Sequence, residues 1–184
     1  HIGEKLVCYY IYDELADFPA NVRIRELLLE YDERLCRRAD VVFATSQSQH
    51  RRRKAQNPRT YYVPNGVDYP LFRSALDPTT EIPPQIMALP RPIVGFVGWL
   101  GFHIDVGLLV ALSEAYPETS FVLVGPDALE KDQLWGKLRS QSNVWFMGRK
   151  KRQELPGFLK AFDAVLMPWI VSGHILAAYP LKLH

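Results

Sequence analysis

The chain has 184 residues, of which 48% are hydrophobic and 23% charged, with a formal net charge of +2. This composition is typical of a globular protein with a buried core and excludes a disordered chain. The near-neutral charge argues against nucleic acid as the partner, and no apolar run approaches the roughly 18–20 residues of a membrane span.

Two cysteines, Cys8 and Cys36, bear on the compartment and on metal binding. Cys8 lies in an apolar run and Cys36 in a segment with helical periodicity, so we expect both to be buried free thiols. Two isolated cysteines make neither a zinc site nor a disulfide framework, and we expect no metal site. The N-terminal residues lack the apolar stretch of a signal peptide. Together these features predict a reducing, cytoplasmic compartment.

The first part of the chain alternates predicted strands with predicted helices. Strands are expected over residues 6–12, 40–45 and 61–63. The first strand is a continuous apolar run, which is typical of a strand covered on both faces. After it, apolar residues from Ile24 to Leu35 recur at helical spacing. Ser46, with Gln49 three residues later, forms a capping-box pattern that opens a short basic helix.

The segment from Asp68 to Pro92 differs from the rest in its proline content and lack of periodicity. Its prolines are Pro70, Pro78, Pro83, Pro84, Pro90 and Pro92. Such a composition predicts stiff, extended chain between two compact units.

Strand–helix alternation resumes after this segment. Strands are expected over residues 92–98, 121–124, 144–147 and 164–167. Asp105 is placed to cap the helix that follows the first of them. Repeated apolar strands and helices predict parallel sheets and an α/β fold. We therefore predict two Rossmann-like domains, over residues 1–76 and 77–184, both incomplete in this chain.

The candidate functional residues are those that follow the strands of the second block, because ligands of open parallel sheets bind beyond the carboxyl ends of the strands. They are Gly98, Trp99, Gly101, Phe102 and His103 after the first strand, Arg149 and Lys150 after the third, and Leu181 and Lys182 near the end of the chain. Glycines let a backbone approach a ligand closely, and helix N-termini direct free N–H groups to the same place, which suits a phosphate.

Each candidate also has a purely structural interpretation, and the sequence leaves both open. Gly98 is equally suited to a tight turn, and the run from Arg149 to Arg152 to a solvated loop. Trp99 and Phe102 either stack on a ligand or pack in the core. His103, like His174, either contacts a phosphate or lies on the surface.

A cluster of cations lies on the short basic helix. Arg51, Arg52, Arg53 and Lys54 follow one another there. They suit the surface of an anionic membrane, at about 1 kcal/mol for each cation near it, or simply form a solvated helix face.

The residues around the junction of the two predicted domains resemble those of a known family. Residues 40–46, Asp-Val-Val-Phe-Ala-Thr-Ser, are followed by Val-Pro-Asn-Gly-Val-Asp at 63–68 and by Phe72. This pattern resembles the junction of GT-B glycosyltransferases, and more narrowly the retaining family 4 group. Residues 95–98 and 148–168 are similar to later segments of such enzymes. The resemblance begins near Leu6 and covers nearly all of the chain.

The resemblance also implies that the chain is truncated at both ends. Residues 180–183, Pro-Leu-Lys-Leu, are similar to a segment that bacterial polysaccharide and cell-wall members continue with an acidic residue. That residue would come directly after His184. The other member of the family's paired-glutamate motif would fall near Ala177, which is not acidic.

What the resemblance implies is transfer of a sugar from a nucleoside-diphosphate donor to an acceptor hydroxyl, with retention, in polysaccharide or glycolipid synthesis. Residues 77–184 would then bind the donor and residues 1–76 would lie on the acceptor side, with Asp13 and Asn65 at the cleft between domains. No cofactor and no essential metal are expected, and no catalytic base is assigned. The acceptor would be a saccharide or a lipid-linked sugar. The alternatives are a sugar-nucleotide epimerase of the same architecture and a non-catalytic module that binds a nucleotide or a partner.

Overall fold

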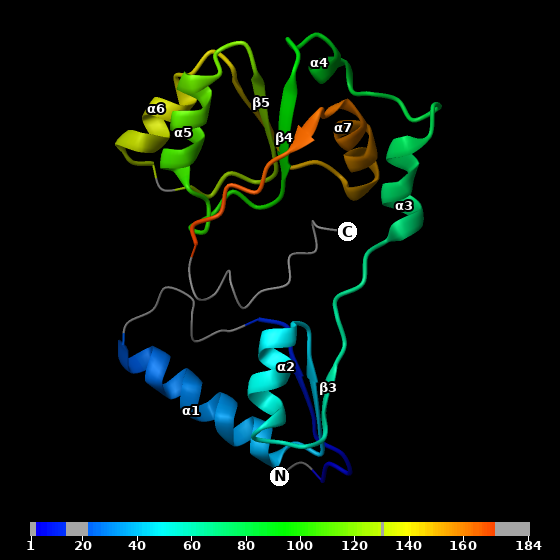
Figure 1. Cartoon of the computed structure of the whole chain (residues 1–184), viewed down its shortest axis with the longest axis vertical. Helices are drawn as coiled ribbons and strands as arrows, with labels where there is room; N and C mark the ends of the chain where they lie inside the picture. The colour runs from blue at the N-terminus through cyan, green and yellow to red at the C-terminus, as the bar shows by residue number, and fades with distance from the viewer. Residues whose placement is uncertain (1–2, 14–21, 130, 172–184) are drawn as a thin grey trace. The chain divides into compact units, whose positions relative to one another are not determined.

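A computed structural model describes residues 3–13, 22–129 and 131–171 of the chain (Figure 1). The chain forms two compact units, and the second unit comprises Asp68–Ile170, so that the first division along the chain falls between Val67 and Asp68. This division precedes the boundary that was predicted after residue 76. Each unit contains a sheet of parallel strands, so the α/β fold class is confirmed. No helix in these ranges is both long and apolar enough to cross a membrane.

The first unit is a three-stranded parallel sheet with two helices. Its elements are β1 (Cys8–Ile11), α1 (Val22–Arg38), β2 (Val41–Ala44), α2 (Gln47–Lys54) and β3 (Thr60–Tyr62). The strand order is β1-β2-β3, so β1 and β3 are the edge strands. All three strands fall within the segments that the sequence predicted or one residue outside them.

One face of this sheet forms the core of the first unit. Ile11 of β1 and Val42 of β2 are buried there against Cys36 of α1 and the neighbouring Ala39. The opposite face carries Tyr10, Phe43 and Tyr61, which the strand register places side by side in one row. Both tyrosines are exposed. The prediction that the first strand is covered on both faces is therefore wrong for the described part of the chain.

The two cysteines differ in burial, as the two faces of this sheet do. Cys36 is a buried free thiol, as predicted, and burial raises its pKa. Cys8 lies on the exposed face of the edge strand β1, so the prediction that it is buried is wrong. An apolar run along a strand alternates between two faces, and only one face of β1 meets the helices.

The start and the interior of α2 are held by polar contacts. The Ser46 hydroxyl accepts a hydrogen bond from the Gln49 N–H at 3.2 Å, and the Gln49 carboxamide oxygen accepts from the Ser46 N–H at 3.3 Å, which confirms the capping box. Further along, the Arg53 guanidinium pairs with the Asp32 carboxylate of α1 at 2.6 Å. The Arg53 side chain is 2% exposed and the Asp32 side chain 17% exposed. The Tyr9 hydroxyl donates to the same carboxylate at 2.6 Å. This buried ion pair joins α1, α2 and β1.

The second unit is a four-stranded parallel sheet with helices on both faces (Figure 1). Its strands, in the order β6-β5-β4-β7, are β4 (Ile93–Val97), β5 (Ser120–Val124), β6 (Val144–Gly148) and β7 (Ala164–Val165). The helices between them are α5 (Val106–Ala115), α6 (Gln133–Arg139) and α7 (Leu155–Ala161).

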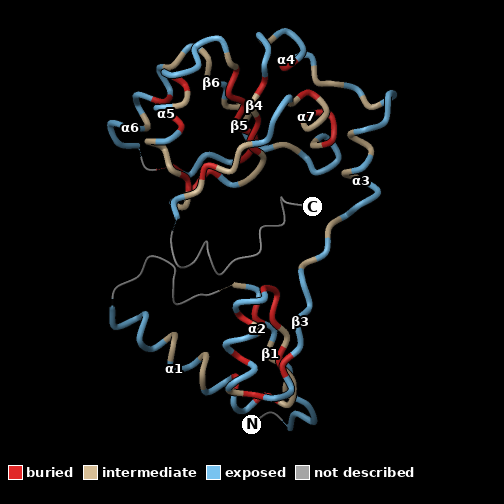
Figure 2. The backbone as a smooth tube through the Cα atoms, in the orientation of Figure 1, coloured by how far each residue is buried: buried red, intermediate tan, exposed pale blue. Residues whose placement is uncertain are grey.

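Two apolar cores lie on the two sides of this sheet. Leu123 of β5 packs with Leu109 of α5 and Leu138 of α6 in one core. Val122 of β5 packs with Phe158 of α7 in the other. Because both faces are covered, every residue of β5 is buried, and the centre of this sheet is the buried region of the unit (Figure 2).

The proline-rich segment belongs to the second unit and is not an extended linker. It forms α3 (Tyr69–Arg73), a 3-10 turn over Ser74–Leu76 and α4 (Pro84–Met87). Pro70 and Pro84 occupy the first turns of their helices, where a missing N–H costs nothing. Ile86 is fully buried in the core beside Phe158. The Lys160 ammonium of α7 donates to three backbone carbonyls of this segment, at 2.7–2.9 Å.

Candidate functional site

The loops that follow the central strands of the second unit converge at the carboxyl edge of the sheet. The Gly98 N–H after β4 donates to the Val124 carbonyl of β5 at 2.8 Å, and the Gly125 N–H donates to the Gly148 carbonyl of β6 at 2.9 Å. Further out, Leu100 exchanges hydrogen bonds with the loop after β5, at 2.8 and 3.0 Å. Three strands therefore end in loops that are tied to one another.

Gly125 is required for this convergence. Its φ is +149°, and a Cβ at this position would lie 1.7 Å from the Gly98 carbonyl oxygen. No other residue allows the two backbones so close. The three glycines at 98, 125 and 148 thus form a stretch of backbone without side chains across the ends of β4, β5 and β6.

Beside these glycines lies an aromatic cluster of four rings, Trp99, Phe102, His103 and Trp169. The Trp99 ring lies 5.6 Å from Phe102 and 5.3 Å from His103, between centroids. His103 in turn meets the edge of Trp169 at 5.6 Å, and its carbonyl accepts a hydrogen bond from Ile170 at 2.9 Å. Trp99 and Phe102 each keep 44% of their surface exposed. The cluster therefore joins the loop after β4 to the chain after β7 and is open to solvent.

The structure gives Gly101 a role that the sequence did not suggest. A Cβ there would lie 2.6 Å from the Trp99 indole ring, so the missing side chain makes room for this ring. The close approach of a ligand to the Gly101 backbone stays a prediction.

Asp105 caps α5, as predicted: its carboxylate accepts a hydrogen bond from the Leu108 N–H at 2.8 Å. The cap places an acceptor and a negative charge at this helix N-terminus. An anion bound at the carboxyl edge therefore needs cations from elsewhere in the unit.

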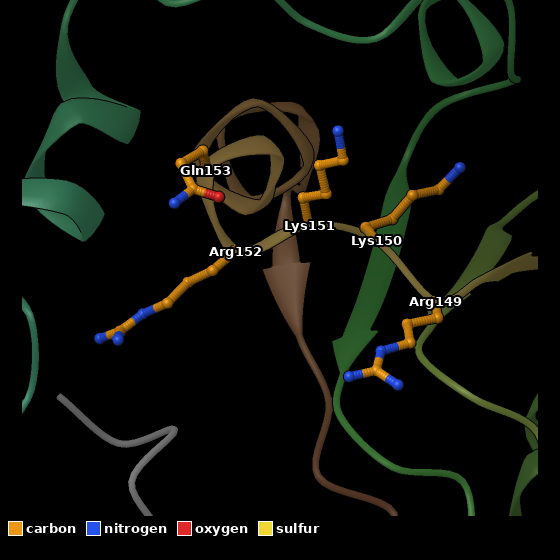
Figure 3. A pocket seen from close by; sticks show the side chains of 5 residues that line it. All are labelled: Arg149, Lys150, Lys151, Arg152 and Gln153. Atoms are coloured by element: carbon orange, nitrogen blue, oxygen red, sulfur yellow. The ribbon is translucent and has the colours of Figure 1, made fainter.

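The cations come from the loop after β6. Arg149, Lys150, Lys151 and Arg152 line an open pocket of about 480 Å³ together with Gln153. Figure 3 shows that Arg149 and Arg152 extend to one side of this loop, whereas Lys150 and Lys151 extend to the other. The four charges are therefore not gathered on one point.

These cations also differ in what already holds them. The Lys150 ammonium lies over the Phe158 ring at 5.4 Å from its centroid. Arg152 pairs with Asp68 at 3.5 Å. Arg149 is exposed and makes no hydrogen bond, ion pair or ring contact with any residue that the structure describes. Lys151 is exposed as well, but Arg149 directly follows Gly148 at the end of β6, so of the four it is the side chain best placed to bind an anion.

The junction signature has a structural role that sequence reasoning missed. Asp68 caps α3 through a hydrogen bond from the Leu71 N–H at 3.3 Å and also pairs with Arg152. The Arg152 guanidinium lies 5.9 Å from the Phe72 ring centroid. The aspartate and phenylalanine of the signature thus hold the basic loop of the same unit, and only the spatial structure brings them together.

The remaining predicted residues are distributed as follows. Asp13 follows β1 and is half-buried, and the Asn65 side-chain oxygen accepts a hydrogen bond from the Tyr10 hydroxyl at 3.2 Å. Their role at an interdomain cleft stays a prediction. Leu181 and Lys182, with His174, lie outside the described residues. Within the described ranges, no three His, Cys, Asp or Glu side chains gather as a metal ion requires.

The predicted cation cluster of α2 needs one correction. Arg53 is buried in its ion pair with Asp32, so it takes no part in a surface. The Lys54 ammonium donates to the Thr60 carbonyl at 3.3 Å and lies over the Tyr61 ring. Only Arg51 and Arg52 remain as exposed arginines of this helix.

Comparisons with known proteins show which proteins this chain is similar to. No family profile matches the sequence. Over 165 residues the chain is 27% identical to "Putative teichuronic acid biosynthesis glycosyltransferase TuaH" of Bacillus subtilis. The matched region covers 86% of this chain and 41% of that protein. The chain thus spans less than half the length of the curated relative that it matches.

Solved structures agree on the fold. HepE of Anabaena, in complex with UDP and glucose, matches with a TM-score of 0.61 and 21% identity over 86% of this chain and 45% of its own. TarM matches with a TM-score of 0.54 and 14% identity over 86% of this chain and 30% of its own. The resemblance to GT-B glycosyltransferases is therefore confirmed, and the chain has their fold over the matched residues. Membership of family 4 stays a prediction.

Proposed function

We propose that this chain, which has the fold of GT-B glycosyltransferases, binds a nucleoside-diphosphate sugar at the carboxyl edge of its second sheet, as part of an enzyme that transfers the sugar to an acceptor hydroxyl. The observation that supports this most is the exposed Arg149 guanidinium, without a partner among the described residues, next to Gly148. HepE, which shares the fold, binds UDP and glucose.

The chemistry requires that the negative charge of the leaving diphosphate be stabilised. The bond between the sugar's anomeric carbon and the diphosphate oxygen breaks, a bond to the acceptor oxygen forms, and the acceptor hydroxyl passes its proton to the released diphosphate or to water. An arginine held beside the diphosphate favours this charge separation, as oxyanion donors do, at about 2.7–4 kcal/mol for each group. The Gly98 N–H already donates to the Val124 carbonyl, so the further candidates for binding the donor are the loop backbone from Trp99 to His103, Lys150, and Leu181 with Lys182.

The finer features of the proposal come from the resemblance alone. They are retention at the anomeric carbon, a hexose as the transferred sugar, and a role in polysaccharide or glycolipid synthesis on the cytoplasmic side of a membrane. The acceptor in this proposal is a saccharide or a lipid-linked sugar. No cofactor and no essential metal take part.

Calorimetric titration of the full chain with UDP tests donor binding. We expect Arg149→Gln to weaken UDP binding roughly 10–150-fold, because a hydrogen bond to a charged group contributes about 1.5–3 kcal/mol. Arg23→Gln is the matched control, since Arg23 is exposed on α1 of the other unit and should leave the affinity unchanged. Equal UDP affinity for Arg149→Gln and wild type would contradict the proposal.

A product assay tests the reaction itself. With UDP-glucose as the donor, the proposal requires that the sugar appear on an added acceptor. Epimerised donor in the absence of an acceptor would support the epimerase instead.

Contact with an anionic membrane rests on Arg51 and Arg52, which are exposed on α2. Two cations contribute only about 2 kcal/mol near such a surface. We expect weak sedimentation with phosphatidylserine vesicles that is lost in 0.5 M salt and in the double variant Arg51→Gln, Arg52→Gln. Sedimentation that persists in the double variant would exclude this surface.

A further inference from the structure

We propose that the exposed rings of the aromatic cluster, Trp99 and Phe102, form a platform that binds a pyranose ring. This inference rests on the proposed function, which places a donor at the same edge of the sheet. The ring comes either from the donor sugar or from the acceptor saccharide, and the chemistry of binding is the same for both.

The first argument is that these rings are not needed to fill the core. In the loop after β4, Leu100 and Ile104 point inward and are buried in the apolar core of the unit. Trp99 and Phe102 alternate with them and remain 44% exposed. The Trp99 ring left in water forgoes the hydrophobic stabilisation that burial would provide, so we look for a ligand on its exposed face.

The second argument is that the platform is preorganised. The Trp99 indole is seated against Gly101, where no Cβ stands in its way. Phe102 meets it edge-on at an interplanar angle of 78°, and His103 packs against both rings. His103 is fixed in turn against Trp169. A ring that is already held in place loses little conformational entropy when a ligand stacks on it.

The third argument concerns the chemistry of the ligand. The C–H groups on one face of a pyranose carry partial positive charge and meet the negative face of an aromatic ring, while the hydroxyl groups around the sugar remain free to hydrogen-bond. The imidazole of His103 lies next to the two exposed rings and supplies a polar group at that border. A neutral ring with an apolar face and a polar rim therefore fits the cluster.

The fourth argument is position. The cluster follows β4 and β7, whereas the basic loop follows β6, two strands away in the order β6-β5-β4-β7. Neighbouring strands lie about 4.8 Å apart, so the strands β4 and β6 that lead into the two features are separated by roughly 10 Å. A nucleoside-diphosphate sugar has a charged part and an uncharged sugar ring. The sheet therefore offers a cation for the one and an aromatic surface for the other.

The experiment compares UDP, UDP-glucose and maltotriose in calorimetric titrations of the full chain. The variants are Trp99→Ala, Trp99→Phe as the conservative replacement, and Tyr116→Ala as a control. Tyr116 is an exposed aromatic residue that directly follows α5, before β5 begins. Thermal unfolding of each variant shows that the fold is kept.

We expect Trp99→Ala to leave UDP binding unchanged and to weaken UDP-glucose or maltotriose roughly 3–10-fold, the range of one aromatic contact. Trp99→Phe should recover most of this loss, and Tyr116→Ala should lose nothing. Loss with UDP-glucose assigns the platform to the donor sugar, and loss with maltotriose assigns it to the acceptor.

Two results would overturn the inference. Equal weakening of UDP and UDP-glucose by Trp99→Ala would assign the ring to the nucleobase. Unchanged binding of both sugar ligands would show that the platform binds no sugar.

Failure of the proposed function is distinguishable from these results. If wild type binds no UDP, the donor site is refuted, and maltotriose alone decides the platform. Binding of maltotriose that Trp99→Ala weakens roughly 3–10-fold then supports the inference, whereas unchanged binding or no binding of maltotriose refutes it.

Discussion

The two parallel sheets of this chain are built from similar apolar strands, yet they are buried to different degrees. Every residue of β5 in the second unit is buried, between α5 and α6 on one side and α7 on the other. In β1 of the first unit only Ile11 is buried. Parallel sheets in stable proteins have both faces covered. The second unit achieves this with its own helices, whereas the described part of the first unit covers one face.

The uncovered surface in the first unit is aromatic and continuous. Tyr10, Phe43 and Tyr61 lie in one row across the three strands, and a ring pair of Tyr10 and Tyr12 extends it, with centroids 6.5 Å apart. The apolar stripe of α1 is also largely exposed (Figure 2). Apolar pattern alone therefore does not tell how far a strand or helix is buried.

The largest effect is expected in the sheet that is covered twice. Phe158→Ala removes a fully buried ring of α7 and should lower the free energy of unfolding of the second unit by about 3–5 kcal/mol. Urea denaturation followed by circular dichroism measures this loss. Phe102→Ala is the matched control, since that ring is exposed and should cost far less. A small loss for Phe158→Ala would mean that the core beside α7 is poorly packed.

The next effect tests what holds the first unit together. Arg53→Met leaves the Asp32 carboxylate without its arginine partner. It should lower the free energy of unfolding by an amount near the lower end of about 3–5 kcal/mol, because the Asp32 side chain is 17% exposed to water. Opening of this region should also expose the Cys36 thiol, which donates to the Arg53 carbonyl oxygen with 3.9 Å between sulfur and oxygen.

Thiol labelling with Ellman's reagent measures that opening in the Cys8→Ser background, because Cys8 is exposed and should itself react in the native state. We expect Cys36 to be protected without the further Arg53→Met change and to react quickly with it. Equal labelling rates for Cys36 in both proteins would show that the ion pair does not keep the unit closed.

A smaller effect is expected on the uncovered face. Tyr61→Ser removes an exposed ring of β3 and should change stability by no more than about 0.5 kcal/mol, as for other surface substitutions. The fluorescence of the hydrophobic dye ANS should fall in this variant if the aromatic row is open to solvent. Stability lost to the extent seen with Phe158→Ala would show that this face is covered.

The smallest expected effect is the loss of stability at acidic pH. The Asp163 carboxylate accepts hydrogen bonds from the Ile93 N–H at 2.7 Å and from the Arg91 guanidinium, and these hold its pKa below the ordinary value. A lowered pKa in the folded state stabilises the protein above the unfolded pKa, and this contribution is lost as the pH falls through the folded pKa.

Denaturation of wild type and Asp163→Asn at several pH values tests this contribution. The variant should be less stable than wild type at neutral pH, and the difference should shrink as the pH drops below the pKa of the folded protein. A difference that does not depend on pH would assign the effect to the hydrogen-bond geometry alone.

The sequence predicted those features that depend on neighbouring residues. Ser46 with Gln49 and Asp105 cap their helices because a cap needs only side chains within three residues of the helix start. The order of strands and helices follows in the same way from local periodicity. The junction signature identified the GT-B fold, which the comparison with HepE confirms.

Burial and pairing over long distances were decided by the tertiary structure. Arg53 is the third cation of a basic run in the sequence, and only the approach of Asp32 from another helix turns it into a core residue. The segment from Asp68 to Pro92 has the composition of a linker, but Ile86 and the Lys160 ammonium fasten it to α7. The sequence by itself determined the type and order of the elements, because these depend on local contacts. Tertiary structure decided which faces meet and which cations stay free, because residues far apart in the chain supply their partners.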